Sequence, residues 1–224
     1  MARLARVVIP GHPHHVTQRG NGRAQTFFGD GDYALYRDLL ALHCRAAGVE
    51  VWAWCLMPNH VHLILVPSDA DGLRRALARV HRSYAGTIQA RRKRTGHFWQ
   101  GRFGAVAMDE SHLAAALRYV SLNPVRARLV GRAQDWRWSS VRAHLRGKDD
   151  GVTALGPVRD RFPSFADLLA SEPEADLFDA LRAAESIGRP LGHDGFLARI
   201  ERQTGRVLKA GRRGRKPSGS KERP

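Results

Sequence analysis

Two histidines separated by a single residue, His60 and His62, are the first candidates for chemistry in this sequence. They follow Met57-Pro58-Asn59 in a run rich in Val, Ile and Leu, which favours a β-strand. Alternate residues of a strand point to the same face, so both imidazoles would project together and could bind one metal ion. The His-x-His pattern is weak by itself, and two ordinary histidines are the alternative.

Tyr119 and Asn123 form a second candidate pair, on a segment with helical spacing that begins near Asp109 or Ser111. Residues i and i+4 share one face of a helix, about 6 Å apart along its axis. The Asn123 amide oxygen would be a hard neutral ligand able to join two imidazoles on Mg²⁺ or Mn²⁺. The Tyr119 hydroxyl could then attack a phosphorus atom held by that ion and form a phosphotyrosine link. A core tyrosine followed by an Asn-Pro helix stop is the alternative for this helix alone.

The elements that must position these residues alternate between strand and helix. Strand-like residues occupy His14–Arg19, the hairpin Val49–Val66 that turns at Met57-Pro58-Asn59, and Phe98–Ala107. Helical spacing of apolar residues begins at Asp32, Leu73 and Ser111. This order predicts an α+β fold, a ferredoxin-like antiparallel sheet with helices packed on one face.

The composition divides the chain into three parts. Residues 1–145 hold the candidate site, and 146–210 follow as an accessory segment with short helices near Phe165–Ala184 and Asp194–Gln203. Residues 211–224 are nearly all Gly, Arg, Lys, Ser and Pro, a composition that cannot bury a core and predicts a disordered basic tail.

The net charge of +16 is concentrated in two stretches. Residues 73–102 carry nine Lys and Arg and no acid, and residues 205–224 carry eight Lys and Arg and one Glu, so +9 and +7 account for the whole excess. Such stretches attract polyanions, which favours a nucleic-acid partner over two merely solvated faces. The tail sequence Arg213-Gly214-Arg215-Lys216-Pro217 resembles an AT-hook core, with nonspecific phosphate attraction as the alternative.

Other features limit the class of protein. No apolar run approaches the roughly 20 residues needed to cross a bilayer, and residues 1–11 lack the apolar core of a signal peptide, so we expect a cytoplasmic, nucleoid-associated protein. Cys44 and Cys55 are interpreted as buried thiols. The remaining aromatic and histidine clusters are interpreted as non-catalytic: His12, His14 and His15 as an exposed polar segment, Trp52 and Trp54 as core residues on one strand face, and Tyr33, Tyr36 and Tyr84 as packing residues.

Five motifs, in order, resemble those of REP-associated tyrosine transposases. They are Val16-Thr17-Gln18-Arg19-Gly20-Asn21, Met57-Pro58-Asn59-His60-Val61-His62-Leu63, Trp99-Gln100-Gly101-Arg102-Phe103, Tyr119-Val120-Ser121-Leu122-Asn123-Pro124-Val125-Arg126-Ala127 and Trp138-Ser139-Ser140. The resemblance covers residues 1 to about 145 and implies an HUH single-tyrosine transposase with a ferredoxin-like catalytic domain. Such an enzyme cleaves and rejoins single-stranded DNA through a 5′-phosphotyrosine intermediate, at or beside short hairpin-forming repeats.

The resemblance assigns roles to individual residues. It makes His60 and His62 the metal ligands, Tyr119 the nucleophile and Asn123 the third ligand, where related transposases often have Gln. Arg128 stands where a glycine is common. The candidate DNA-binding residues are Arg19, Arg74, Arg75, Arg79, Arg82, Arg102, Arg213, Arg215 and Lys216.

Three alternatives stay open at this point. A nonenzymatic hairpin-binding protein could use the same fold, a replication initiator or relaxase would share the chemistry, and a metal hydrolase would use water as its nucleophile. Because related transposases without appendages work as dimers, the extension here favours a monomer.

Overall fold

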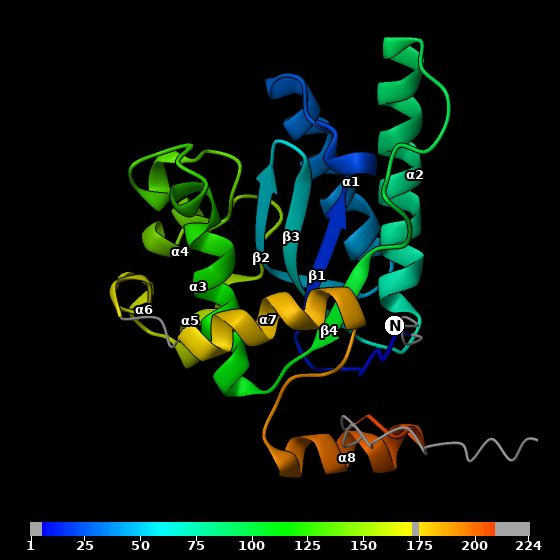
Figure 1. The fold of residues 1–224 in the computed structure, drawn as a ribbon. Coiled ribbons are helices and arrows are strands. Elements are labelled where there is room, and N and C mark those ends of the chain that lie inside the picture. The colour runs from blue at the N-terminus through cyan, green and yellow to red at the C-terminus, as the bar shows by residue number, and fades with distance from the viewer. Residues whose placement is uncertain (1–5, 172–174, 209–224) are drawn as a thin grey trace, which may run out of the picture.

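The computed structural model describes residues 6–171 and 175–208, and a four-stranded antiparallel sheet lies at its centre (Figure 1). Its strands lie in the order β2-β3-β1-β4. Their bounds are β1 His14–Arg19, β2 Val49–Met57, β3 His60–Pro67 and β4 Gly104–Ala107. The predicted hairpin is the β2–β3 pair, and β1 lies between β3 and β4, so the two histidines on β3 are close to the middle of the sheet.

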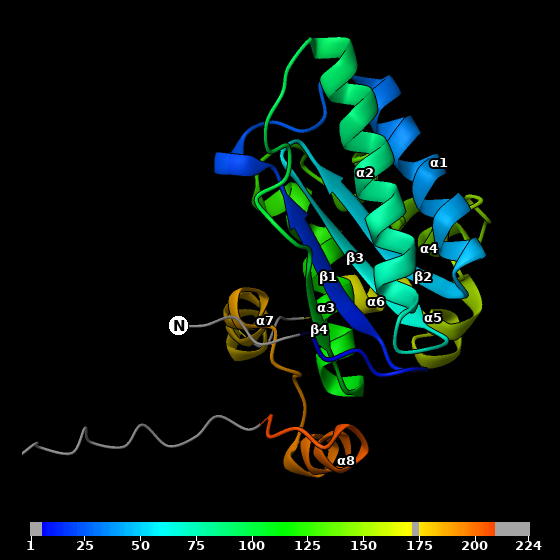
Figure 2. The same cartoon turned by 90° about the vertical axis from the view of Figure 1, so that its right-hand side faces the viewer.

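Helices cover both faces of this sheet, as the side view shows (Figure 2). Helices α1 (Asp30–Ala46) and α2 (Gly72–Arg92) pack on one face, and α3 (Glu110–Arg126) packs on the other. The α+β class and the antiparallel sheet are therefore confirmed, but the prediction that helices cover one face only is wrong.

The reason lies in the two hairpin strands, which are apolar at nearly every position rather than at alternate ones. On β3, Leu63 and Leu65 pack against α1 and α2, whereas Ile64 and Val66 belong to the cluster beneath α3. A strand buried on both faces has a continuous apolar sequence, and a strand with one solvated face alternates.

An irregularity in β2 changes the direction of one tryptophan. The pairing of β2 with β3 shifts register between Val51 and Ala53, where a bulge inserts an extra residue. Trp52 therefore packs on the α3 side and Trp54 on the α1 and α2 side, both less than 5% exposed. Both are core residues as expected, but they do not share one strand face.

The fourth strand is shorter than the sequence suggested. Only Gly104–Ala107 forms a strand, and Trp99 contributes a single bridge to Gly20. Between them, Gly101 has a φ of +145°, a conformation that L side chains rarely adopt and that interrupts the extended backbone.

Helix α3, which carries Tyr119, has well-defined ends. The Asp109 side chain caps its first turn by accepting from the His112 backbone N–H at 3.0 Å. Pro124 lies inside the helix, which continues to Arg126 rather than ending at Asn123. The C-terminus is a Schellman motif in which Arg128 adopts a φ of +56°, a position where glycine is usual.

The segment after residue 140 is helical and packs back onto the sheet layer. Its helices are α4 Val141–Arg146, α5 Leu155–Arg161, α6 Phe165–Ala170, α7 Ala175–Ile187 and α8 Asp194–Thr204, and two 3₁₀ turns elsewhere span Asn21–Arg23 and Ala133–Asp135. Helix α7 packs against α3 and β4. The division at residues 145 and 210 stays a prediction, and residues 211–224 lie outside the described residues.

The C-terminal end of β4 pairs with the chain's own extension. The Leu191 backbone N–H donates to the Ala107 carbonyl at 2.8 Å, and the Asp109 N–H donates to the Leu191 carbonyl at 3.0 Å. An edge strand paired in this way has fewer free backbone groups for joining a second sheet.

Two sequence-based expectations concern cysteines and membranes. Cys44 and Cys55 are buried free thiols, and burial raises the pKa of Cys44 to about 12. Among the described residues, every helix is too short or too polar to cross a membrane.

Candidate active site

The two candidate metal ligands lie on the sheet face that α3 covers. His60 and His62 project from the same side of β3, with ring centroids 4.8 Å apart and nearly perpendicular planes. Nδ1 of His60 is 2.6 Å from the Asn59 side-chain oxygen, and Nδ1 of His62 is 3.0 Å from Nε2 of His15. In each of the two imidazoles Nδ1 is therefore within hydrogen-bond distance of a neighbouring side chain, and Nε2 is the nitrogen that could bind a metal ion.

His15 is a site residue that the sequence reasoning missed. It is 1% exposed and His14 is fully buried, so the expectation that His12 to His15 form an exposed polar segment is wrong for these two. They face opposite sides of β1, because consecutive strand residues do so. The His15 ring stacks on His62 at 5.3 Å, and the His14 Nε2 atom accepts from the Ile9 N–H at 3.1 Å.

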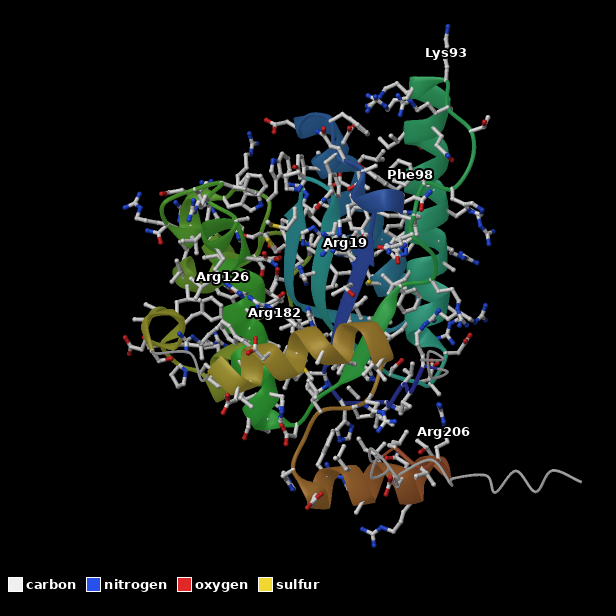
Figure 3. All side chains as sticks on the ribbon, viewed as in Figure 1. Arg19, Lys93, Phe98, Arg126, Arg182 and Arg206 are labelled. Atoms are coloured by element: carbon white, nitrogen blue, oxygen red, sulfur yellow. The ribbon has the colours of Figure 1, made fainter. Side chains whose placement is uncertain are left out.

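Tyr119 reaches this histidine cluster from α3. Its ring meets His62 edge to face at 5.5 Å and His15 in the same manner at 5.8 Å. The ring also packs against Phe178 of α7, 5.6 Å away, and lies near the Arg126 guanidinium, which is 5.0 Å from the ring centroid. Tyr119 is consequently only 8% exposed. Figure 3 labels Arg126 on α3 and Arg182 on the neighbouring α7.

Burial keeps the imidazoles of this cluster neutral. Desolvation, reinforced by the charge of Arg19, lowers the pKa of His60 to about 3. Desolvation lowers the pKa of His15 to about 4, and desolvation with the nearby His60, His15 and Arg19 lowers that of His62 well below 6.5. Neutral imidazole is the form that binds metal ions, so no proton need be displaced from these rings at neutral pH.

Asn123 lies one turn beyond Tyr119 on α3 and is half-buried. Its backbone carbonyl accepts from the Ala127 N–H at 2.9 Å. Its role as third ligand stays a prediction, because no described contact joins its side chain to His60 or His62.

Backbone hydrogen bonds gather the motifs around the end of β1. The Gly20 N–H donates to the Asn59 carbonyl at 2.9 Å, and the Gln100 N–H donates to the Arg19 carbonyl at 2.9 Å. A Cβ on Gly20 would lie 2.2 Å from the Ala24 carbonyl oxygen, so only glycine fits this close approach. Arg19 pairs in register with His60, which places this predicted DNA contact beside the candidate ligands.

Comparison with known proteins identifies the family. The model of the family described as "Transposase IS200 like" matches residues 10–123, which is just over half of the 224 residues. The chain belongs to the IS200-like transposase family. A Haemophilus influenzae protein named as a REP-associated tyrosine transposase is 26% identical over 131 residues, which cover 52% of this chain and 74% of that protein.

A solved structure shares the fold of this IS200-like transposase. It is a REP-associated tyrosine transposase bound to a REP hairpin, with a TM-score of 0.57 and 23% sequence identity, covering 69% of this chain and 92% of its own. The predicted resemblance to this group is confirmed by these matches.

Within the described residues, the other predicted DNA contacts of this IS200-like transposase lie on or beside α2, on the opposite face of the sheet. Arg74 and Arg102 line a pocket of about 480 Å³ beside α2, together with Gln18, His81 and Trp99. They therefore do not share a surface with the histidine cluster.

Two of the predicted contacts on α2 are already engaged by carboxylates. Arg74 pairs with Asp71 at 2.5 Å and Arg75 pairs with Asp69 at 2.5 Å. Within the part of the chain that the structure describes, Arg79 and Arg82 are exposed and make no ion pair. Arg213, Arg215 and Lys216 lie outside the described residues.

His60 and His62 could bind a divalent cation if an amide oxygen or water supplied the remaining ligands. No group of three His, Cys, Asp or Glu side chains gathers as a metal site in residues 6–171 and 175–208. Two neutral histidines with engaged Nδ1 atoms match the usual arrangement, in which a ligating histidine hydrogen-bonds through its second nitrogen. The residues present therefore fit a two-histidine site that keeps open positions.

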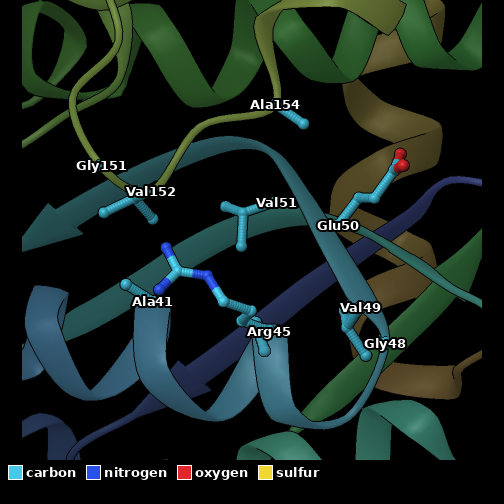
Figure 4. Close-up of a pocket in the computed structure, with 10 residues that line it drawn as sticks. Ala41, Arg45, Gly48, Val49, Glu50, Val51, Gly151, Val152 and Ala154 are labelled. Atoms are coloured by element: carbon cyan, nitrogen blue, oxygen red, sulfur yellow. The ribbon is translucent and has the colours of Figure 1, made fainter.

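A second pocket lies away from this cluster (Figure 4). It measures about 360 Å³ and lies between the end of α1, the start of β2 and residues 151–154. Arg45 and Glu50 are its charged lining residues, and its lining contains no histidine or tyrosine. It has none of the groups that the phosphoryl chemistry requires.

Proposed function

We propose that this chain is a metal-dependent single-stranded DNA endonuclease and strand transferase that acts at hairpin-forming repeats. The observation that carries the proposal is the packing of the Tyr119 ring against His62 at 5.5 Å, with His60 beside it on the same sheet face. A potential nucleophile and two potential metal ligands thus meet from two different elements.

The reaction would be a transesterification at phosphorus. The Tyr119 phenolic oxygen attacks the scissile phosphate, the bond to the deoxyribose 3′ oxygen breaks, and the released strand takes up a proton as a 3′-hydroxyl. The product is a 5′-phosphotyrosine, which a 3′-hydroxyl of another strand can reverse. One bond of the same type forms as one breaks, so the strand is rejoined without an external energy source.

His60 and His62 would hold the metal ion, Mg²⁺ or Mn²⁺, with Asn123 as the third protein ligand. When bound, the ion offsets negative charge on the phosphate oxygens in the transition state. The Arg126 guanidinium lies 5.0 Å from the Tyr119 ring centroid, so its positive charge would be close to a phosphate brought to this residue.

The DNA partner is inferred from charge and from the relatives. The described basic residues Arg79 and Arg82 are exposed on α2, and the whole chain carries +16. The structural relative is bound to a REP hairpin, which supports hairpin DNA as the ligand here. The pairing of Leu191 with the end of β4 supports a monomer, since it leaves fewer free backbone groups for joining a second sheet.

One observation favours a second candidate, a hairpin-binding protein without catalysis. Tyr119 is 8% exposed and its ring packs against Phe178, so we expect α7 or the ring to move before the hydroxyl group meets a phosphate. A binder would need no such movement.

The decisive experiment measures covalent attachment. A single-stranded repeat hairpin with its flanks, labelled 3′ of the cleavage site, is incubated with protein in Mg²⁺ or Mn²⁺. Wild type should form a denaturation-resistant labelled species whose phosphopeptide contains Tyr119, and Tyr119→Phe should form none while binding the hairpin normally. Tyr33→Phe is the matched control, because Tyr33 is equally buried at 8% and packs on the other sheet face.

Three other results would redirect the proposal. An adduct on Tyr119→Phe would assign another nucleophile. Tight hairpin binding by wild type without any adduct would favour the nonenzymatic candidate. Full cleavage by the double variant His60→Ala, His62→Ala in Mg²⁺ would remove the two histidines from the metal site.

A further inference from the structure

His15 contacts both His62 and Tyr119, although nothing in its local sequence distinguishes it. It lies on β1 beside β3, where Thr17 pairs with His62 and His15 is the diagonal neighbour on the same face. The rings of His15 and His62 are within 10° of parallel, and both side chains are 1% exposed. Nε2 of His15 and Nδ1 of His62 are 3.0 Å apart, a hydrogen-bond distance in a site that excludes water.

This hydrogen bond decides which nitrogen of His62 can bind a cation. A neutral imidazole has one N–H and one lone pair, so a proton on Nδ1 leaves the lone pair on Nε2. If His62 donates through Nδ1 to His15, its Nε2 atom can bind metal. If His15 donates instead, the His62 proton lies on Nε2 and blocks that atom.

His60 provides an internal comparison for the direction. The Asn59 amide group donates through Nδ2 to the Arg23 carbonyl at 3.0 Å, so its oxygen faces Nδ1 of His60. An amide oxygen only accepts, which makes Nδ1 of His60 the donor and leaves its Nε2 lone pair available. If His62 likewise carries its proton on Nδ1, both histidines direct an Nε2 lone pair from the same face of the sheet.

We propose that His15 is a positioning residue that accepts the Nδ1 proton of His62 and so holds His62 with its Nε2 lone pair directed at a divalent cation. The inference rests on the proposed function, because the cation belongs to it. His15 itself touches no cation, and it acts through the orientation and tautomer of His62. Its ring also packs at 5.8 Å from Tyr119, which fixes the spacing between the ligand and the nucleophile.

The first test reads the tautomer in the metal-free protein. Long-range ¹H–¹⁵N correlation of histidine-labelled wild type should show His62 protonated at Nδ1, with the signal assigned by its loss in His62→Gln. In His15→Phe, which keeps a planar ring without a nitrogen, the Nε2-protonated form of His62 should appear. Wild type with the His62 proton on Nε2 would overturn the proposal.

The second test measures Mn²⁺ affinity by calorimetry. Loss of a partner that orients a metal ligand typically weakens binding by about 10- to 100-fold, and we expect that range for His15→Phe. His15→Gln, whose side-chain oxygen can accept the same proton, should recover most of the affinity. His14→Phe is the matched control, because His14 is equally buried but faces the other side of β1.

The outcomes separate the inference from the proposed function. Wild-type Mn²⁺ affinity retained in a folded His15→Phe, as judged by its thermal transition, would refute the role of His15. If wild type binds no Mn²⁺, the metal site of the proposed function fails. The tautomer measurement still decides the His15 hydrogen bond in that case.

Discussion

Phe178 of α7 covers the candidate nucleophile, and we expect Phe178→Ala to raise the rate at which Tyr119 forms a covalent adduct. The Phe178 ring is 8% exposed, meets Tyr119 edge to face at 5.6 Å and lies 5.3 Å from the Arg126 guanidinium. We expect these contacts to break before a phosphate reaches the Tyr119 hydroxyl group. Adduct formation should therefore include an opening step of α7.

The size of the effect follows from the contacts that opening breaks. Exposing a buried Phe side chain costs about 1.5–3 kcal/mol, and the edge-to-face ring pair adds about 0.5–1.5 kcal/mol. Their sum, about 2–4.5 kcal/mol, corresponds to at least about 30-fold in the opening equilibrium at roughly 1.4 kcal/mol per tenfold. The initial rate should rise by that factor until the open form predominates.

The assay follows adduct formation on a labelled hairpin under single-turnover conditions, with hydrogen exchange of α7 amides as an independent measure of opening. Phe165→Ala is the matched control. Phe165 is 6% exposed on α6 in the same extension, and it stacks on His144 at 4.4 Å rather than on Tyr119. It should lose comparable stability without any gain in adduct rate.

Equal adduct rates in wild type and Phe178→Ala, with faster exchange of α7 in the variant, would refute the reasoning. That result would mean that Tyr119 reaches the phosphate by a movement of its own ring or of α3. A rate increase of the same size in Phe165→Ala would point instead to general loosening of the extension.

Three further expectations concern stability and DNA binding. Arg128→Gly should raise the free energy of unfolding in urea by about 0.5–1 kcal/mol. A left-handed backbone costs residues other than glycine about 1–2 kcal/mol, and the greater chain entropy of glycine in the unfolded state offsets about 0.5–1 kcal/mol of that gain. An unchanged urea midpoint would contradict this. Asp32→Asn should cost about 1.5–3 kcal/mol at pH 7 by removing charged hydrogen bonds from Arg91 at 2.6 and 2.8 Å. Burial raises the pKa of Asp32, but Arg91 and the Phe28 N–H outweigh burial and lower the pKa below 3.8. The difference in unfolding free energy between wild type and Asp32→Asn should therefore shrink as the pH falls below about 4. A difference that stays constant with pH would argue against this ion pair. The double variant Arg79→Ala, Arg82→Ala should reduce the slope of log K against log salt for single-stranded DNA by about 1.4, at roughly 0.7 per lost phosphate contact; an unaltered slope would remove both from the interface.

Local spacing predicted the elements of this fold well, because most of them carry their own signals. The turn at Met57-Pro58-Asn59 and the cap at Asp109 place the hairpin and α3 within a few residues. The layer arrangement was missed for a different reason. The run Ala53-Trp54-Cys55-Leu56 has no polar position, and such a strand is buried on both faces, so the signal for a second helical layer was present in the sequence.

The partners of the candidate site could not be predicted from local pattern. His15 and His62 are 47 residues apart, and their hydrogen bond depends on the register of β1 against β3. A one-residue slip would turn His15 to the α2 side, where His14 now lies. Phe178 contacts Tyr119 only because α7 packs on α3. The sequence of α7 contains no local pattern that predicts this contact.

The basic surface shows how a count of charges can misplace an interface. The stretch 73–102 carries +9 by sequence, but it excludes three aspartates that the fold brings to it. Asp71 and Asp69 pair with Arg74 and Arg75, and Asp32 pairs with Arg91. An arginine that is already paired with an aspartate displaces fewer counterions from DNA when the protein binds. Such arginines therefore contribute little to the salt dependence of DNA affinity.

The effective positive surface is therefore shifted along α2. It is centred on Arg79 and Arg82 and extends to the C-terminal end of the helix, where Figure 3 labels Lys93 at the tip. Arg92 at that end stacks its guanidinium 3.8 Å from the Phe28 ring centroid, which orients the group without cancelling its charge. Since the fold neutralises the first turn of α2 and Arg91 but leaves Arg79, Arg82 and Arg92 positive, a phosphate backbone should meet α2 from its middle to its C-terminus. Arg74 and Arg75 should contribute least among the four arginines proposed on that helix.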